Sequence, residues 1–436
     1  MAAGKAAPGD GRRHGGLLRQ RSFRLFWIGE TVNQLGSAMA LIGVPLLAVL
    51  SLHATTFDVG ALAAAAYLPW LVIGLPAGAW VDRLPPRPVM IACDAASAAL
   101  YASVPLAYAA GVLTIGQLLA VQLLAGAAAV VFGTAYQVNL PSLVASSELA
   151  EGNAKLQASS SAAALGGRGL SGLVTQVIGT TAALACNAVS FLVSAACLLA
   201  ITAPEPRPVS PREVSTVRRD VAEGLALVFR DPYLRPLTLF GGLANFALDA
   251  LAALVVVFLV RVVGLDAGLT GLLAALPGLG GLLAAFVARP VIARTGSARS
   301  LLLATVGALP FALLIPLAGQ GPGLVCYAAG TLVAATGVTM GNIIMATFRQ
   351  VYCPPGMLGR VTATMRFVTM GTSPFGALAG GALGTWLGPR NALWVVLSIL
   401  AVSGTPLLSR DFTRHRDLPA GPAVPARAQV SFPPPA

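Results

Sequence analysis

The sequence predicts an all-α integral membrane protein in which about twelve transmembrane helices form two pseudo-symmetric six-helix bundles. Of its 436 residues, 56% are hydrophobic and only 10% are charged. A bilayer crossing needs roughly 20 mainly apolar residues, so the hydrophobic residues suffice for about twelve crossings. This composition, with a mean hydropathy of +0.79, excludes a soluble enzyme, a coiled coil and a disordered chain.

Apolar segments long enough to cross a bilayer follow one another along the chain. Polar residues interrupt the start of the eleventh segment, near Val361, so eleven crossings is the alternative count. The twelve segments are 23–51, 58–81, 88–110, 114–138, 155–179, 181–202, 234–261, 268–288, 299–318, 322–346, 361–386 and 390–409.

The positive charges indicate the orientation of these segments. With the N-terminus in the cytoplasm, 24 of the 28 Lys and Arg residues fall on the cytoplasmic side, Arg261 and Arg390 fall on the other side, and Arg168 and Arg366 fall within segments. Cytoplasmic loops of membrane proteins carry such an excess. The net charge of +12 therefore reports topology rather than an affinity for nucleic acid. We expect a multi-pass protein of the cell (cytoplasmic) membrane with both termini cytoplasmic.

The connection between the sixth and seventh segments divides the chain into two halves. Residues 203–233 mix prolines, charges and an amphipathic stretch, so they are expected to link a bundle at 23–202 to a bundle at 234–409. An ordinary cytoplasmic loop is the alternative, and the two interpretations are compatible. A basic cytoplasmic tail at 1–22 and a disordered, Pro- and Ala-rich cytoplasmic tail at 410–436 complete the predicted organisation.

The two halves resemble each other in sequence after a Pro-containing loop. When Leu149 is aligned with Leu358, Gly167 falls on Gly376 and Gly172 falls on Gly381. Repeated six-helix halves are typical of transporters, whose substrate site lies between the halves near the middle of the membrane.

A charged motif closes the second segment at the cytoplasmic boundary. Gly78, Asp82, Arg83 and Arg87 form a G-x-x-x-D-R-x-x-x-R pattern, which we interpret as a gating motif. Asp82 can accept a hydrogen bond from a helix end or from an arginine across the bundle interface, and so act as a breakable latch. The two arginines can bind lipid headgroups or pair with acids such as Asp94. The alternative is an arginine cluster that only sets topology.

This motif resembles the signature that the major facilitator superfamily carries in the same loop of a twelve-segment chain. It differs at Pro85 and Pro86, where the family usually has a glycine and a basic residue. The resemblance covers roughly residues 20–410. NLPSLVASSELAEGNAKLQ and EVSTVRRDVAEGLALVFRDPYLRPL resemble the branch of bacterial exporters related to the enterobactin exporter. The resemblance implies the major facilitator fold and proton-coupled efflux of small amphipathic molecules. In the G-P-x-x-x-G motif that such exporters often carry, Arg168 replaces the proline.

Polar residues within the first segment lie on one helical face. Glu30, Asn33, Gln34 and Ser37 are spaced at i, i+3, i+4 and i+7, which favours a hydrated cavity. Ionisable residues inside a membrane are costly and therefore functional candidates. Glu30 is a candidate for proton coupling, and the other three are substrate-cavity candidates. The alternative is a structural carboxylate paired with Arg21 or Arg24.

Further ionisable and polar residues fall deep within later segments. Asp249, midway through the seventh, is the second proton-coupling candidate, with a structural partnership to Arg168 as the alternative. Arg168 can bind an anionic group, stabilise an ionised acid or form a buried ion pair. Arg366 is expected to be interfacial, with its charge reaching the membrane surface. The remaining substrate-cavity candidates are Gln157, Arg168, Asn245 and Asn342.

The sequence therefore predicts a secondary active transporter that exports drugs, siderophores or secondary metabolites by alternating access. An uptake symporter of the same fold is the alternative, and a non-transporting membrane sensor is a further one. No catalytic set lies within the segments, so we do not expect an enzyme. We expect no metal site and no cofactor, with the proton gradient as energy source. The expected partners are the lipid bilayer and a small-molecule substrate, without nucleic acid, and the expected state is a monomer.

Overall fold

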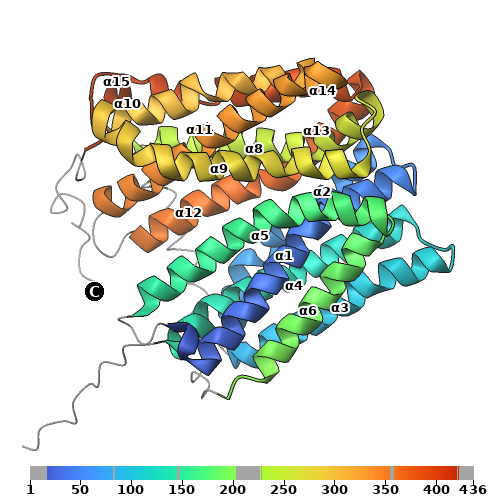
Figure 1. Ribbon diagram of the computed structural model, residues 1–436. Helices are drawn as coiled ribbons and strands as arrows, with labels where there is room; N and C mark the ends of the chain where they lie inside the picture. The colour runs from blue at the N-terminus through green and yellow to red at the C-terminus, as the bar shows by residue number, and fades with distance from the viewer. Residues whose placement is uncertain are drawn as a thin grey trace, which may run out of the picture.

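Helices supply the regular structure of this protein because a chain in lipid must satisfy its backbone hydrogen bonds within each segment. The computed structural model describes residues 17–81, 84–144, 148–202, 226, 228–353, 358–419 and 421. Within these ranges the regular elements are helices and no strand occurs. Figure 1 shows two helical layers, one from each half of the chain.

The N-terminal half consists of six long helices in chain order. Thr114 caps α4, since its Oγ1 accepts a hydrogen bond from Gln117 N at 3.2 Å, and Pro86 begins α3, where the missing N–H costs nothing. Helix α1 packs against α5 and α6, α2 packs against α4, and α3 packs against α4 and α6. The six helices are α1 (Arg21–Leu50), α2 (Thr56–Val81), α3 (Pro86–Ala109), α4 (Ile115–Leu143), α5 (Leu149–Val177) and α6 (Ala182–Leu199).

The C-terminal half has six corresponding helical rods, several of them irregular. The first ends in a π-helical turn at Phe258–Val262, and the third passes from α-helix through a π-helical turn at Leu303–Gly307 to a 3-10 helix at Leu309–Leu317. Helix α8 packs against α13 and α14, and α9 packs against α11. The helices are α8 (Leu234–Val257), α9 (Ala267–Thr295), α10 (Ser297–Leu302), α11 (Leu324–Tyr352), α12 (Leu358–Gly371), α13 (Ser373–Leu387), α14 (Pro389–Val402) and the short α15 (Arg410–Thr413).

Ten helices in the described part of the chain are long and apolar enough to cross a membrane. The two predicted segments outside this set are the fifth, which forms the polar helix α5, and the eleventh, which is divided into α12 and α13 between Gly371 and Ser373. Both lie where the halves meet, because α5 packs against α9 and α13 packs against α2. Helices of both halves therefore pack against them, and polar residues on the packed faces cost less than polar residues in lipid.

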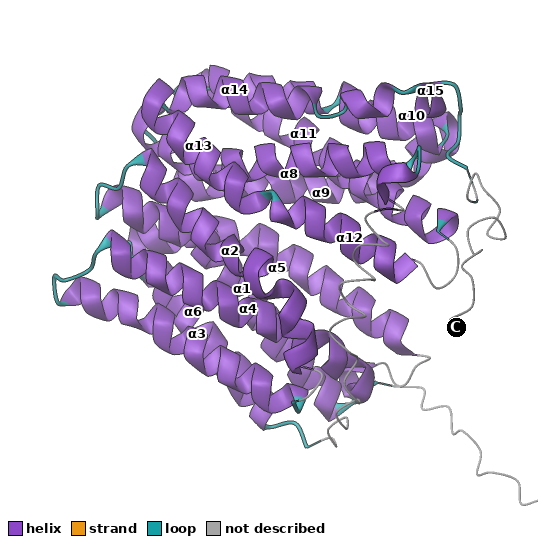
Figure 2. Ribbon diagram, turned by 180° about the vertical axis from the view of Figure 1, so that it is seen from behind, coloured by secondary structure: helices purple, strands orange, loops and turns teal. Residues whose placement is uncertain are grey.

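The halves cross at two glycine pairs that occupy equivalent places. A Cβ atom on Gly172 of α5 would lie 2.7 Å from the Cα of Gly271 on α9, and one on Gly60 of α2 would lie 2.8 Å from the Cα of Gly381 on α13. Only glycine permits backbones to approach so closely. Both crossings lie near the end of the molecule that carries the α1–α2 connection, and the two layers diverge toward the opposite end (Figures 1 and 2).

The glycines that align between the two halves make equivalent contacts. Gly167 packs against α1, where an added Cβ would lie 2.8 Å from Leu35 O, and Gly376 packs against Phe246 of α8, the first helix of the other half. Gly172 and Gly381 each pack against the second helix of the opposite half. The internal repeat read from the sequence is therefore a structural repeat.

The C-terminal segment departs from the prediction of a disordered tail from residue 410 onward. Residues 410–413 form α15, with Phe412 fully buried. Asp417 Oδ1 accepts a hydrogen bond from Ser297 N at 2.8 Å at the start of α10, and Arg416 O accepts one from Ala298 N at 3.1 Å. Burial of one aromatic ring and capping of a helix hold this segment on the α9–α10 turn, so disorder does not extend to residues 410–418.

The predicted linker falls mainly on residues 203–225, which lie outside the described residues. Its last part is described, and there Asp231 Oδ1 accepts hydrogen bonds from Tyr233 N and Leu234 N, both at 2.9 Å. Tyr352 Oη donates to Asp231 Oδ2 at 2.8 Å. The start of α8 is thereby joined to the end of α11.

Candidate functional site

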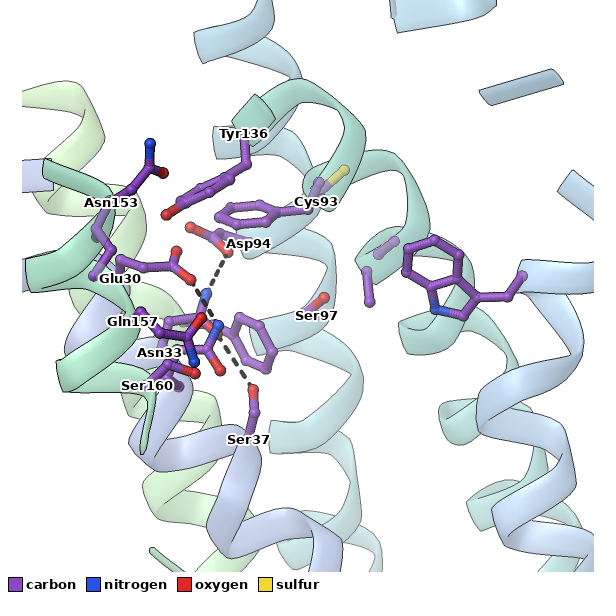
Figure 3. A pocket seen from close by; sticks show the side chains of 18 of the residues that line it. Glu30, Asn33, Ser37, Cys93, Asp94, Ser97, Tyr136, Asn153, Gln157 and Ser160 are labelled. Carbon is purple, nitrogen blue, oxygen red and sulfur yellow. Dashed lines mark hydrogen bonds between the residues drawn. The ribbon is translucent and has the colours of Figure 1, made fainter. Parts of the chain in front are cut away.

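The candidate site is a cavity of about 450 Å³ in the N-terminal half. Its walls come mainly from α1, α3, α4 and α5, and the other half contributes Arg366 from α12. Figure 3 shows its polar side chains gathered at one side. Both the size and the mixture of polar and aromatic groups suit a small-molecule site.

The polar stripe of the first helix faces this cavity as predicted. Glu30, Asn33, Gln34 and Ser37 all contribute to its wall. Gln34 Nε2 donates to Glu30 Oε1 at 2.7 Å, and Ser37 Oγ donates to Asn33 Oδ1 at 3.3 Å. The stripe turns inward because small residues on another face of α1 pack closely against α6, as at Gly43, where an added Cβ would lie 2.7 Å from Ala183 Cβ.

Asp94 of α3 is the main site residue that the sequence did not identify. Its exposure is 1%, and its Oδ1 accepts a hydrogen bond from Asn33 Nδ2 at 3.2 Å. Its Oδ2 is buried and has no hydrogen-bond partner among the described residues, although the Ser194 side chain lies close to the carboxyl. An acid within the third predicted segment, at the ninth position of α3, is the signal that could have indicated it, since an intramembrane charge is a functional candidate.

Neither cavity acid is paired with a cation in the described part of the chain. The ion pair found there joins Lys155 and Glu151 at 3.4 Å on the exposed start of α5. The alternative pairing of Glu30 with Arg21 or Arg24 is therefore wrong, and so is the pairing of Asp94 with Arg87. Arg87 Nη1 instead donates to Ile201 O at 3.0 Å. Two carboxyls thus share a partly buried cavity with no ion-pair partner among the described residues.

Arg366, which was expected at the membrane interface, is an exposed residue of α12. The residue contributes to the cavity wall, and its guanidinium lies 5.5 Å from the centre of the Trp70 ring on α2. A guanidinium over an indole face is stabilised by a cation–π interaction. The contact joins the two halves, because α12 packs against α2. A sequence pattern within one segment cannot show that contact.

Aromatic and amide side chains complete the cavity. Tyr136 of α4 stacks on Phe26 with ring centroids 5.2 Å apart, and Phe132 lies one turn before it on the same wall. Gln157, a predicted cavity residue, and Asn153 line the cavity from α5. Figure 3 shows Tyr136 close to Glu30 and Asp94. An apolar ring surface therefore adjoins the two acids.

The other predicted candidates lie outside this cavity. Asp249 of α8 has the Ser373 side chain beside it, and Asn245 Nδ2 donates to Thr369 O at 3.4 Å. Arg168 has a buried Nε without a hydrogen bond among the described residues, and no ion pair joins it to Asp249 there. The pairing of these two residues is therefore wrong. Asn342 is exposed on α11.

The predicted gating motif is described only in part. Gly78 belongs to α2. Arg87 is buried at the start of α3, and its Nη1 donates a hydrogen bond to Ile201 O, just after α6 in the same half. Asp82 and Arg83 lie outside the described residues. The described side chains contain no group of three or more His, Cys, Asp or Glu residues that could hold a metal ion.

A helical membrane protein built from two related six-helix halves, with a polar cavity in one half to which the other half contributes a residue, has the architecture of a secondary transporter. The model of the Major Facilitator Superfamily matches residues 26–374. The chain belongs to this superfamily.

Other proteins resemble the chain over most of its length. An uncharacterised MFS-type transporter, y4rN, from Sinorhizobium fredii (strain NBRC 101917 / NGR234) is 27% identical over 395 residues, which cover 88% of this chain and 94% of the relative. The nucleoside transporter NupG has a TM-score of 0.70 at 14% identity, covering 89% of this chain and 98% of its own.

A bacterial homologue of the iron transporter ferroportin has been solved in two states that both resemble this chain. The inward-facing state has a TM-score of 0.67 at 17% identity, covering 90% of this chain and 99% of its own. The outward-facing state has a TM-score of 0.59 at 17% identity, covering 89% and 98%. These likenesses show the fold.

Proposed function

We propose that this chain is a proton-coupled exporter of small amphipathic molecules, such as drugs, siderophores or secondary metabolites. The observation that carries the proposal is the pair of acids, Glu30 and Asp94, in a cavity where neither has a cationic partner in the described part of the chain. Buried carboxylates are costly unless compensated. Protons and a substrate can each compensate them, so occupancy by one favours release of the other.

Proton exchange in the cavity involves titratable groups from several helices. Glu30 comes from α1, Asp94 and Cys93 from α3, and Tyr136 from α4, while α12 contributes the positive charge of Arg366. A carboxyl that takes up a proton loses its negative charge, and Arg366 favours the ionised acids. We propose Glu30 and Asp94 as the coupling pair. Asp249 is kept as a second coupling candidate because it is an ionisable residue midway through α8.

The arrangement of the halves supports alternating access. They are joined closely at the Gly60–Gly381 and Gly172–Gly271 crossings, and their other ends diverge. The higher TM-score to the inward-facing than to the outward-facing ferroportin homologue is consistent with an inward-facing arrangement. We propose that both termini lie in the cytoplasm of a cell whose cytoplasmic membrane holds the protein, so that the cavity opens to the cytoplasm.

The resemblance of two loop sequences to the exporters related to the enterobactin exporter supports efflux over uptake. An uptake symporter would use the same cavity with the opposite coupling. Efflux and uptake are distinguished by the sign of the proton movement that accompanies the substrate, so the test must record that sign.

The test is substrate-driven pH change in proteoliposomes that contain a pH-sensitive dye. A panel of tetraphenylphosphonium, ethidium, chloramphenicol and erythromycin covers charged and neutral amphipathic compounds. We expect at least one compound to move protons in the opposite direction to itself. Glu30→Gln and Asp94→Asn should each reduce this flux at least tenfold, an order-of-magnitude expectation for loss of a buried charge interaction. The surface variant Glu151→Gln should match the wild type.

Three results would contradict the proposal. Proton flux that is unchanged in both cavity variants but lost in Asp249→Asn would assign coupling to Asp249 instead. Compound uptake without any proton movement would remove proton coupling altogether. Proton movement in the same direction as the compound would indicate the symporter.

A further inference from the structure

We propose that the cavity selects organic monocations, with the positive charge of the substrate at Glu30 and Asp94 and its apolar body against the adjoining aromatic rings. This charge selectivity rests on the proposed function only because it takes the cavity as the substrate site. It does not require that substrate movement is coupled to protons. It narrows the substrate from amphipathic molecules in general to those with one positive charge.

The first ground is the charge left uncompensated at one side of the cavity. Asn33 and Gln34 each donate one hydrogen bond to an acid, at 3.2 Å to Asp94 and 2.7 Å to Glu30. Asp94 Oδ2 is buried with no hydrogen bond in the described part of the chain. Amide donors stabilise a carboxylate only in part, so a cationic ligand would compensate the remaining negative charge. An anionic ligand would be repelled there.

The second ground separates an organic cation from a metal ion. The cavity of about 450 Å³ lies in the range that encloses drug-sized molecules. No cluster of three metal-binding side chains occurs among the residues that the structure describes. Phe132 and Tyr136 line the cavity beside the acids, and the faces of aromatic rings attract organic cations. Rings of this kind add nothing to the binding of a hydrated divalent ion.

The third ground limits the substrate to one positive charge. Arg366 lines the same cavity from the opposite half, where it lies over Trp70 rather than beside an acid. A second positive charge on the substrate would approach this guanidinium and be repelled by it. A monocation can satisfy the acids and leave Arg366 facing its neutral part.

The experiment compares two ions of the same shape and opposite charge. Binding of tetraphenylphosphonium and of tetraphenylborate to the purified full-length protein is measured by equilibrium dialysis in a non-ionic detergent. We expect the phosphonium to bind at least tenfold more tightly than the borate. Glu30→Gln and Asp94→Asn should each weaken phosphonium binding about tenfold, which is 1.4 kcal/mol. The matched surface variants Glu151→Gln and Asp266→Asn should leave it unchanged.

The wild-type comparison does not depend on any variant being folded. Equal binding of the two ions, or tighter binding of the borate, would overturn the proposal. So would saturable binding of Mn²⁺ that Asp94→Asn abolishes while phosphonium binding is unaffected, since the site would then hold a metal ion. Phosphonium binding without proton flux in proteoliposomes would contradict the proposed coupling and leave the charge selectivity standing.

Discussion

Asp94 shows how a residue acquires its role from neighbours on other helices. Its carboxyl is held by Asn33 of α1, lies close to Ser194 of α6 and faces the same cavity as Glu30. Within α3 alone it is one acid in an apolar sequence. The sequence of α3 could have marked it as an intramembrane acid, but the role assigned to it depends on three helices that meet only in the folded protein.

Replacement of Arg366 is expected to raise the affinity of the cavity for an organic cation. Replacing it in Arg366→Gln removes a positive charge from the cavity while keeping a polar side chain of similar length. We expect phosphonium binding to strengthen by about three- to tenfold, because repulsion across the cavity is lost. Equilibrium dialysis measures the change, and Arg299→Gln on the exposed side of α10 is the control. Weakened phosphonium binding in Arg366→Gln would show that the arginine supports the site rather than limiting it.

Several site residues were predictable from the sequence and others were not. The stripe of Glu30, Asn33, Gln34 and Ser37 was predicted because a helical period fixes which residues share a face. Gln157 was predicted as a cavity residue of the fifth segment and lines the cavity from α5. Asp94 and the Arg366–Trp70 contact depend on how helices pack side by side, and no period within one segment contains that information.

At the scale of elements, α5 and the α12–α13 pair explain why the count of apolar helices differs from the count of predicted segments. Both were recognisable as helices. Helix α5 is long but polar, whereas the eleventh segment is divided into α12 and α13, each of which is too short to cross a membrane alone. The paired glycines of these elements were predicted as a repeat. Their contacts with α9 and α2 became evident only from the structure, since the repeat itself does not indicate which helices pair across the interface.

The Gly172–Gly271 crossing predicts a conformational effect of a single methyl group. In Gly172→Ala the added Cβ would meet the backbone of α9, including Ala267 O and the Cα of Gly271. Overpacking of this kind costs about 1–3 kcal/mol, so the closed arrangement of this end should become less populated. Gly166→Ala on the same helix is the control, because nothing lies within 4 Å of its Cβ position.

The shift can be measured with spin labels at the diverging end. Labels on Glu151→Cys at the start of α5 and Ala293→Cys near the end of α9 occupy exposed positions, in a background without native cysteines. We expect Gly172→Ala to shorten the distance distribution between them, because the diverging ends approach as the crossing opens. An unchanged distribution in Gly172→Ala would show that the crossing does not set the conformation.

The docked C-terminal segment gives a second test at this scale. Asp417→Ala removes the acceptor for Ser297 N at the start of α10 and should cost about 1 kcal/mol, as loss of a helix cap does. Trypsin should then cleave after Arg414 and Arg416 faster than in the wild type. Asp417→Asn keeps an acceptor oxygen and should restore slow cleavage. Equal cleavage rates in all three proteins would mean that the cap does not hold the segment.

For the whole molecule, two halves of related structure enclose one cavity that is strongly asymmetric in charge. Both acids belong to the N-terminal half, and the arginine belongs to the C-terminal half. Movement of the halves therefore changes the distance between opposite charges, and occupancy of the acids by a proton or a cation alters the energy of that movement. Binding of a proton or a cation to the acids is thereby coupled to the movement of the halves that alternating access requires.

Protons and an organic cation are proposed to compensate the same two carboxyls, Glu30 and Asp94. The most direct test of this proposal adds tetraphenylphosphonium to the protein in weakly buffered non-ionic detergent and records proton release between about pH 5 and pH 8. We expect proton release on binding in the wild type, reduced release in Glu30→Gln and in Asp94→Asn, and none when both residues are replaced. Phosphonium binding without proton release anywhere in that range, or release that persists in the double variant, would contradict it.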